Sequence, residues 1–341
     1  MDGETSESCS LAPEDLRILR TLQLAPRAPF ATIAAVLGTS EASLSRRHAR
    51  MRRAGVLHVA GVVDPGAFGQ TQWLVRLRCR PGSAAAIAES LALRADVGWV
   101  ALSAAGTEVT CVVRSRSQEA REDLLGTRLP RAAAVLDLEV SVVMRKFAGG
   151  RGEYRTVFDG VLTPDEEAAL GGTSDTVVER SAVSDVGPLQ DGDEPLLDAL
   201  VRDGRASHVD LAVATGLTAG RAARRLADLV ERRVVHFHLE LAPAALGLAV
   251  GANLWLHVHP SRLRAVGRAL AGMPQLGFAL AVSGRANLHA LVHCRDTDEL
   301  FELTSDRIGG LPGVDGLEVS PVLRHVKQSG ALTVGRRLET G

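Results

Sequence analysis

The sequence has few aromatic residues, few cysteines and no long uncharged apolar run. Aromatic residues make up 3% of the 341 residues, which weakens any proposal of single-strand binding by base stacking. Cys9, Cys79, Cys111 and Cys294 show no C-x-x-C spacing, so we expect buried reduced thiols rather than a zinc site. No segment predicts export or membrane insertion, and we therefore expect a cytoplasmic protein with no membrane partner.

Net charge is also small, at −1, which argues against a general polyanion binder but leaves local charged patches open. The hydrophobic fraction of 46% and the charged fraction of 23% are those of a folded protein. A chain of 341 residues is too long for one ordinary core, so the length predicts two or more domains.

Positive charge is concentrated in a short stretch, residues 40 to 55. Ser40 is a good N-cap, and Gly55 can end the helix in the left-handed conformation. Leu44, His48 and Met51 share one face at helical spacing, and hydroxyl and arginine side chains occupy the other. A short cationic helix of this kind suits a DNA major groove, although a solvated amphipathic helix has the same charge pattern. The residues predicted to contact DNA are Ser40, Ser43, Ser45, Arg46, Arg47, Arg50 and Arg53.

The preceding residues favour DNA binding. Leu16, Leu19 and Leu22 predict a first helix, residues 30 to 37 a second, and Gly38 a tight turn before the cationic helix. Three short helices with such a turn are a helix-turn-helix arrangement. Residues 14 to 57 hold eight arginines against three acids, a net charge of +5, as expected of a phosphate-binding module.

The next segment alternates strictly, with Val75, Leu77 and Cys79 on one face of a strand and arginines on the other. Up to Phe147, the pattern predicts the order β-α-β-β-α-β, an α+β ferredoxin-like unit with both helices on one face of an antiparallel sheet. A second sheet from another copy would cover the other face, so we expect a homo-oligomer formed by sheet pairing.

Residues 148 to 193 hold ten acids and three arginines and are rich in Gly, Ser and Thr. Thr163 and Pro164 predict a short helix within this linker. Elsewhere it is a solvated spacer, or it lies against the basic helix when DNA is absent.

The first half of the chain is then repeated. Residues 33–38 correspond to 211–216 at an offset of 178, and residues 138–145 correspond to 317–324 at an offset of 179. One residue of slippage over the whole unit indicates duplication. The sheets of the two units pair either within one chain, as a pseudo-two-fold unit, or between chains. The second cationic helix, 218–233, contains Gly220, and residues 194–235 have a net charge of only +1, so Arg221, Arg224 and Arg225 should bind DNA less well. The predicted segments are a helix-turn-helix domain (12–63), a ferredoxin-like domain (70–147), an acidic linker (148–193), a weaker helix-turn-helix domain (194–241) and a second ferredoxin-like domain (250–328).

This order resembles that of the leucine-responsive regulatory protein/AsnC (Lrp/AsnC) family, in its tandem two-unit actinobacterial type. The motifs that carry the resemblance are Asp15-Leu16-x-Ile18-Leu19, Ile33-Ala34-x-x-Leu37-Gly38-x-Ser40, Ser45-Arg46-Arg47 and Ala54-Gly55-Val56-Leu57. The resemblance implies a sequence-specific transcription regulator that binds double-stranded DNA and senses an amino acid or related small molecule. The family's Gly and following Asp near the effector pocket are represented by Gly106, Gly284 and Asn287 without the carboxylate, which disfavours an effector held by its ammonium group.

Other chemistry has little support in the sequence. The pairs His236-x-His238 and His257-x-His259 place imidazoles on one face of a strand, and a metal site would require the two pairs to meet. No catalytic motif or phosphate-binding glycine loop is present, so we expect neither an enzyme nor a cofactor. The alternative to a DNA-binding regulator is a ligand-sensing oligomerisation protein that no longer binds DNA.

Overall fold

The structure is a computed structural model and describes residues 11–64, 70–114, 118–149, 154–171, 189–190, 192–328, 331–335 and 337–339. Cys9 and residues 150–153, 172–188 and 191 of the acidic linker lie outside the described residues. The other three cysteines are free and buried, as predicted. Within the described ranges, no helix has the length and apolar character needed to cross a membrane.

Two helix-turn-helix modules, called here the first head and the second head, are present as predicted. Ser40, Ser207 and Thr218 each accept a backbone N–H at the start of a helix, and Gly38 and Gly216 end the middle helices with φ of 65° and 70°. The helices are α1 (Pro13–Leu24), α2 (Phe30–Leu37) and α3 (Glu41–Arg53) in the first head, and α9 (Asp193–Arg202), α10 (His208–Thr215) and α11 (Ala219–Glu231) in the second.

Each head is followed by a β-α-β-β-α-β unit, which confirms the predicted α+β fold class. In the first unit Val75, Leu77 and Cys79 are buried against α4, as their alternation predicted. The first unit consists of β2 (Trp73–Cys79), α4 (Ala84–Ala92), β3 (Val97–Ser103), β4 (Glu108–Val113), the helical segment from α5 (Gln118–Glu122) to α6 (Leu129–Arg131), and β5 (Val135–Ala148). The second consists of β7 (Val250–Val258), α12 (Leu263–Ala271), β8 (Leu276–Val282), β9 (Leu288–Cys294), α13 (Thr297–Glu302) and β10 (Val314–Gln328).

The two sheets join into one closed ring of strands, β3-β4-β2-β5-β8-β9-β7-β10, in which β10 also pairs with β3. The long strands β5 and β10 make both joins. β5 pairs with β2 up to Val142 and with β8 from Val143, and β10 changes its partner from β7 to β3 at Val322. Of the two sheet pairings that the sequence left open, the structure shows the pairing between the two units of one chain.

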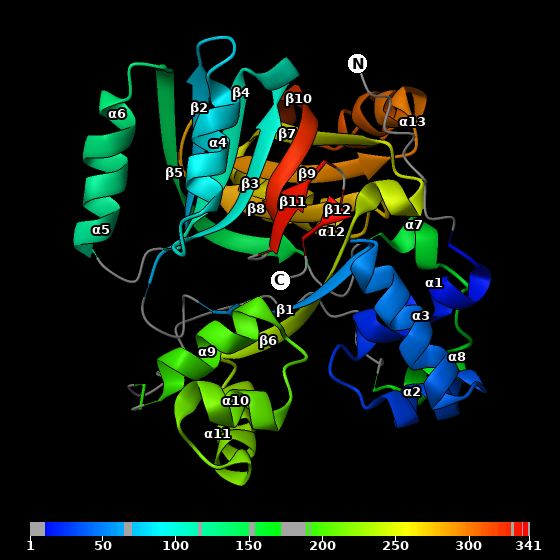
Figure 1. The fold of residues 1–341 in the computed structure, drawn as a ribbon. Coiled ribbons are helices and arrows are strands. Elements are labelled where there is room, and N and C mark those ends of the chain that lie inside the picture. Colours follow the sequence, from blue (N-terminus) through cyan, green and yellow to red (C-terminus); the bar gives the residue numbers. More distant parts are fainter. Residues whose placement is uncertain are drawn as a thin grey trace, which may run out of the picture.

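The heads are linked by a separate antiparallel ribbon made of β1 (Leu57–Val63) and β6 (Val235–Leu241). Leu57 pairs with Leu241 at one end and Val63 with Val235 at the other, so each strand follows its own head and runs against the other. Figure 1 shows this ribbon between the two heads, with both heads on the same side of the closed sheet. The ribbon gives the heads an approximate two-fold relation within one chain.

The described part of the linker packs against the first head and is not a spacer. Tyr154, Phe158 and Leu162 are buried in the core of that head, before, at the end of and after the short helix α7 (Arg155–Phe158). The predicted short helix is α8 (Pro164–Ala169), capped by Thr163. Its acids Glu166 and Glu167 pair with arginines of α1, so these linker acids lie against α1 rather than α3.

Candidate nucleic-acid interface

The inward face of α3 is the one the spacing predicted. Leu44 and Met51 are 0% exposed and His48 is 8% exposed, within the core of the first head. Burial, followed by repulsion from Arg205 and Arg52, lowers the pKa of His48 to about 4. This imidazole is therefore neutral near pH 7 and packs as an apolar ring, 5.0 Å from the ring of Phe30.

Two of the predicted DNA-contacting arginines are tied to a buried carboxylate. Asp15 of α1 is 0% exposed, and its two oxygens accept from Arg47 Nη1 at 3.0 Å and Arg50 Nη2 at 2.5 Å. The side chain of Arg47 is 34% exposed and also lies 3.8 Å from Glu14, whereas that of Arg50 is 49% exposed. Arg47 thus joins α3 to α1, while Arg50 keeps donors available on its outer side.

The outward face of α3 carries the remaining candidates. Arg46 and Ser45 are exposed, and Arg46 has no ion-pair or hydrogen-bond partner among the described residues. Arg53 is exposed and donates only to the carbonyl of Ala49, at 3.3 Å. Ser40 accepts from the backbone N–H of Ser43 at 3.2 Å, which makes Ser40 a helix cap.

The second head repeats the buried ion pair but lacks most of the outward charge. Asp193, at the position of Asp15, accepts from Arg225 through Nε at 2.5 Å and through Nη2. Burial by itself would raise the pKa of Asp193, but the hydrogen bonds from Arg225 lower it below its usual value. Arg221 and Arg224 are exposed. Where α3 has Arg50, α11 has Asp228, which pairs with Arg225 at 2.5 Å.

A reciprocal arginine pair also fixes the heads against each other. Arg27 of the first head donates to the carbonyls of Gly204 and Ala206, the latter at 3.0 Å. Arg205, its counterpart at an offset of 178, donates to the carbonyls of Pro26 and Ala28 at 2.6 and 3.0 Å. Burial lowers the pKa of both arginines. These contacts hold the heads in one relative orientation.

The sequence analysis missed the two ion pairs and this arginine pair, although their signal was present. Asp15 and Asp193, like Arg27 and Arg205, are identical residues at an offset of 178. A search of the repeat for repeated charged residues, rather than for motifs alone, would have found them.

The predicted effector residues lie in two turns that already make close internal contacts. Gly106 ends the turn before β4 with φ of 83°. At Gly284, with φ of 115°, a Cβ atom would lie 2.7 Å from Ser141 Oγ. The Asn287 amide donates to the Val258 carbonyl at 2.7 Å and accepts its N–H at 2.9 Å. Asn287 thus uses both polar groups of its side chain on the backbone of β7.

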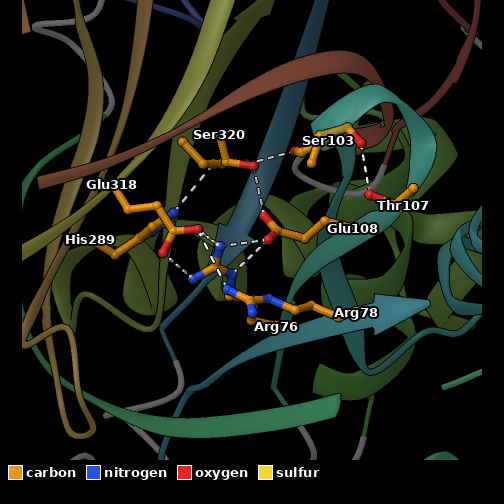
Figure 2. A network of polar contacts seen from close by, with 10 residues as sticks. Arg76, Arg78, Ser103, Thr107, Glu108, His289, Glu318 and Ser320 are labelled. Atoms are coloured by element: carbon orange, nitrogen blue, oxygen red, sulfur yellow. Dashed lines mark hydrogen bonds and ion pairs between the residues drawn. The ribbon is translucent and has the colours of Figure 1, made fainter. Parts of the chain in front are cut away.

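A polar network crosses the interior of the closed sheet beside these turns. Figure 2 shows Arg76 directed between two carboxylates, Glu108 of its own unit and Glu318 of the other. The Arg76 side chain is 8% exposed, and its guanidinium lies 4.5 Å from the ring centroid of Trp255, its counterpart at an offset of 179. Because one copy of the pair is an arginine and the other a tryptophan, the two units differ where they meet. Ser103, Asn253, His289 and Ser320 complete the network.

The four histidines considered as metal ligands do not gather. His238 lies 3.3 Å from Glu240 on β6, and His257 and His259 are exposed at the end of β7. Across the described ranges, no group of three His, Cys, Asp or Glu side chains is placed to hold a metal ion.

Comparison with protein-family models supports both kinds of domain. A model of the AsnC-type helix-turn-helix domain matches residues 15–52 and again residues 190–230. A model of the Lrp/AsnC ligand binding domain matches residues 252–332. The two helix-turn-helix matches coincide with the first and second heads and support the tandem arrangement.

Curated relatives are HTH-type transcriptional regulators. One, FL11 of Pyrococcus horikoshii, is 26% identical over 148 residues, which is 97% of its length but 43% of this chain. Another, Ptr1 of Methanocaldococcus jannaschii, is 24% identical over 143 residues, covering 97% of its length and 42% of this chain. Each relative therefore corresponds to less than half of the present chain.

A solved structure, that of the siroheme decarboxylase NirDL, covers 94% of this chain and 93% of its own, with a TM-score of 0.59 and 16% identity. At this identity the likeness concerns the fold alone. The expectation that the chain is not an enzyme, which rested on the absence of catalytic motifs, was wrong, because an enzyme has this fold over nearly the whole chain. The missing catalytic motif does not exclude catalysis.

Proposed function

Because the chain belongs to the Lrp/AsnC family, with two AsnC-type helix-turn-helix domains and an Lrp/AsnC ligand binding domain, we propose that it is a sequence-specific transcriptional regulator with unequal heads. The first head is the stronger reader of double-stranded DNA, and the second adds modest affinity. The observation that carries this assignment is the outward face of α3, where Arg46, Arg50 and Arg53 are exposed around Ser45.

The roles of the candidate residues follow from their contacts. Arg46 and Arg53 are the main phosphate or base contacts, and Arg50 reaches DNA with the donors that Asp15 leaves available. Arg47 acts indirectly, because its link to α1 orients the helix. In the second head Arg221 and Arg224 point outward, while Arg225 stays on Asp193.

The test is a titration of DNA recovered by selection from random sequences, at several salt concentrations. Removing one phosphate contact should reduce the slope of log affinity against log salt by about 1. We expect this reduction for Arg46→Ala and a smaller one for Arg224→Ala, the matched change in the second head. If Arg46→Ala binds like the wild type, α3 is not the reader. If selection enriches no sequence, the protein is a ligand sensor that does not bind DNA.

A small-molecule effector and association of several copies complete the proposal. The family model of a ligand binding domain supports an effector, and the buried free thiols suit the cytoplasm. Because the two sheets already pair within the chain, association between copies needs a different surface. Light scattering measures it directly, since a single chain has a mass of 36.0 kDa.

A second candidate function is catalysis on a tetrapyrrole. It is favoured by the likeness to NirDL, which extends over both units in the same order rather than over one domain. The structure of that enzyme has also been determined with an iron-uroporphyrin III analogue. Adding this iron tetrapyrrole to the present protein and recording its absorbance spectrum tests binding, and carbon dioxide release from siroheme tests the activity. An unchanged spectrum, together with no release, rejects the second candidate.

A further inference from the structure

A pocket that is partly open to solvent lies where the second unit meets the first head, away from the turn of Gly284 and Asn287. It is bounded by β9, by β10, by the single-turn helix η4 (Pro243–Leu246) that follows β6, and by the C-terminal strand β11 (Ala331–Val334). The apolar part of its lining includes Ala242, Pro243, Ala244, Leu248, Val322 and Leu323.

Two buried imidazoles meet at the wall of this cavity. His293 of β9 is 2% exposed, and its Nε2 lies 3.4 Å from Nε2 of His325 on β10. Neither Nδ1 atom has a hydrogen-bond partner among the described residues, and the same is true of the buried hydroxyl of Thr333. Burial lowers the pKa of His293 to about 3 and that of His325 to about 4, so both rings are neutral near pH 7. Buried polar groups without partners in a cavity wall are available to a ligand.

The charge of the lining selects among ligands. All the lining residues are described, and Arg324 is the only lysine or arginine among them, while none is an aspartate or a glutamate. Arg324 is paired on its outer side with Glu89, at 2.7 Å. A ligand ammonium would therefore find no carboxylate in the cavity, whereas an anion would find a guanidinium and imidazole N–H donors.

We propose that this cavity binds a small organic anion with an apolar body and no ammonium group, and that this anion is the effector of the regulator. The effector role rests on the proposed function, whereas the binding itself does not.

One residue of the cavity wall, Leu248, also packs in the core of the first head, which provides a route to α3. Leu248 lies in the same hydrophobic core as Leu44 and Met51 of α3. Tyr154, another member of that core, has its ring 5.5 Å from the ring of His293. An anion that moves His293 or Leu248 therefore repacks the inner side of the recognition helix.

The C-terminal strands provide a second route. Thr333 of β11 and Gly335 line the cavity, and Thr333 pairs with Leu338 of β12 (Arg337–Leu338). The backbone N–H of Leu338 donates to the carbonyl of Gly55 at 2.9 Å, at the turn that ends α3. A Cβ atom on Gly55 would lie 2.7 Å from the Leu338 carbonyl oxygen, so the two segments are in close contact. Binding at Thr333 can thus be transmitted to the end of α3 through the strand pairing of Thr333 with Leu338.

The binding test is calorimetry on the full chain with two probes, 3-phenylpropanoate and L-phenylalanine, which differ only by the ammonium group. We expect 3-phenylpropanoate to bind at millimolar concentration or below and L-phenylalanine to bind at least about tenfold more weakly. The double variant His293→Gln/His325→Gln should lose about tenfold in affinity. His257→Gln, an exposed histidine on β7, is the matched control and should change nothing. Ala249→Phe at an exposed lining position should block the cavity without disturbing the buried histidines.

Equal binding of the two probes, or no heat from 3-phenylpropanoate, overturns the assignment. A loss of affinity in the His257→Gln control equal to that in the double variant also overturns the assignment.

The effector role is measured separately, as the affinity for selected DNA with and without saturating 3-phenylpropanoate. Coupled sites typically change each other's affinity about fivefold or more, and Ala249→Phe should abolish this change. If the anion binds and no DNA sequence is ever selected, the proposed function fails and the cavity assignment stands. If DNA is bound and the anion is not, the cavity assignment fails alone. If both bind independently, the cavity is a site without an effector role.

Discussion

Replacing Arg225 with alanine should destabilise the second head far more than replacing its neighbour Arg224. The Asp193 side chain is 1% exposed, and two guanidinium nitrogens of Arg225 bind its two oxygens. Without Arg225, the backbone N–H of Gln190 still donates to Asp193 at 2.7 Å and the charge of Arg232 still lowers the pKa of Asp193, but both guanidinium hydrogen bonds from Arg225 are lost. Leaving a buried carboxylate without its cation costs 3–5 kcal/mol, and the remaining hydrogen bond places the expected loss near the lower limit, at about 3 kcal/mol.

Replacing other arginines of the two heads should cost less stability, in an order set by their contacts. Arg47→Ala leaves Asp15 with Arg50 at 2.5 Å and with the backbone N–H of Ala12 at 3.0 Å, so we expect a loss of about 1 kcal/mol. Arg224→Ala removes an exposed side chain and should change the stability by less than about 0.5 kcal/mol.

Amide hydrogen exchange measures the stability of each head separately, whereas a global unfolding curve of a protein with several domains does not. A loss of about 3 kcal/mol should accelerate exchange in α9, α10 and α11 by about a hundredfold in Arg225→Ala. Exchange in α1, α2 and α3 is the internal control and should stay unchanged. The reasoning is refuted if Arg224→Ala accelerates exchange in the second head as much as Arg225→Ala does.

Three further predictions concern other contacts of the fold. His48 has a folded pKa of about 4 against 6.5 unfolded, so its contribution to stability is present above pH 6.5 and falls as the pH drops towards 4. His48→Leu should remove about 2 kcal/mol of the loss between pH 7 and pH 4.5 in urea titrations. Arg27→Ala/Arg205→Ala should loosen the heads, seen as a wider distribution of distances between spin labels on α3 and α11, with each head still folded. Glu108→Gln should cost about 3 kcal/mol in urea unfolding and Glu318→Gln about 1, because Glu108 is 4% exposed and Glu318 50%.

The elements of the fold could be predicted because their signals are local. The alternation of Val75, Leu77 and Cys79 identified the buried face of β2, and the spacing of Leu44, His48 and Met51 identified the inner face of α3. Both patterns follow directly from the strand and helix periods. The repeat, at offsets of 178 and 179, then predicted the tandem arrangement.

What could not be predicted depends on contacts between distant segments. The closure of the two sheets rests on β5 and β10 continuing past their own sheets, and a long strand has the same sequence pattern whether it ends or continues. The packing of Tyr154 and Phe158 on the first head was hidden because the surrounding residues have the composition of a linker. We expected no catalysis because the sequence lacks catalytic motifs. The likeness to an enzyme over 94% of the chain shows that the absence of these motifs does not exclude catalysis.

The two heads share some arginines at equivalent positions and differ at others. The arginines that hold the structure are present twice, as Arg47 and Arg225 on their buried carboxylates and as the reciprocal pair between the heads. The outward arginines at the end of α3 are not repeated, because α11 has Asp228, Val230 and Glu231 in the places of Arg50, Arg52 and Arg53. The repeated arginines make contacts within the fold that both copies need. The contacts of the outward residues differ between the copies, so each head can vary there. Under the proposed function, a second head with the same fold and docking but less outward charge is expected to support the first head and to add little DNA affinity of its own.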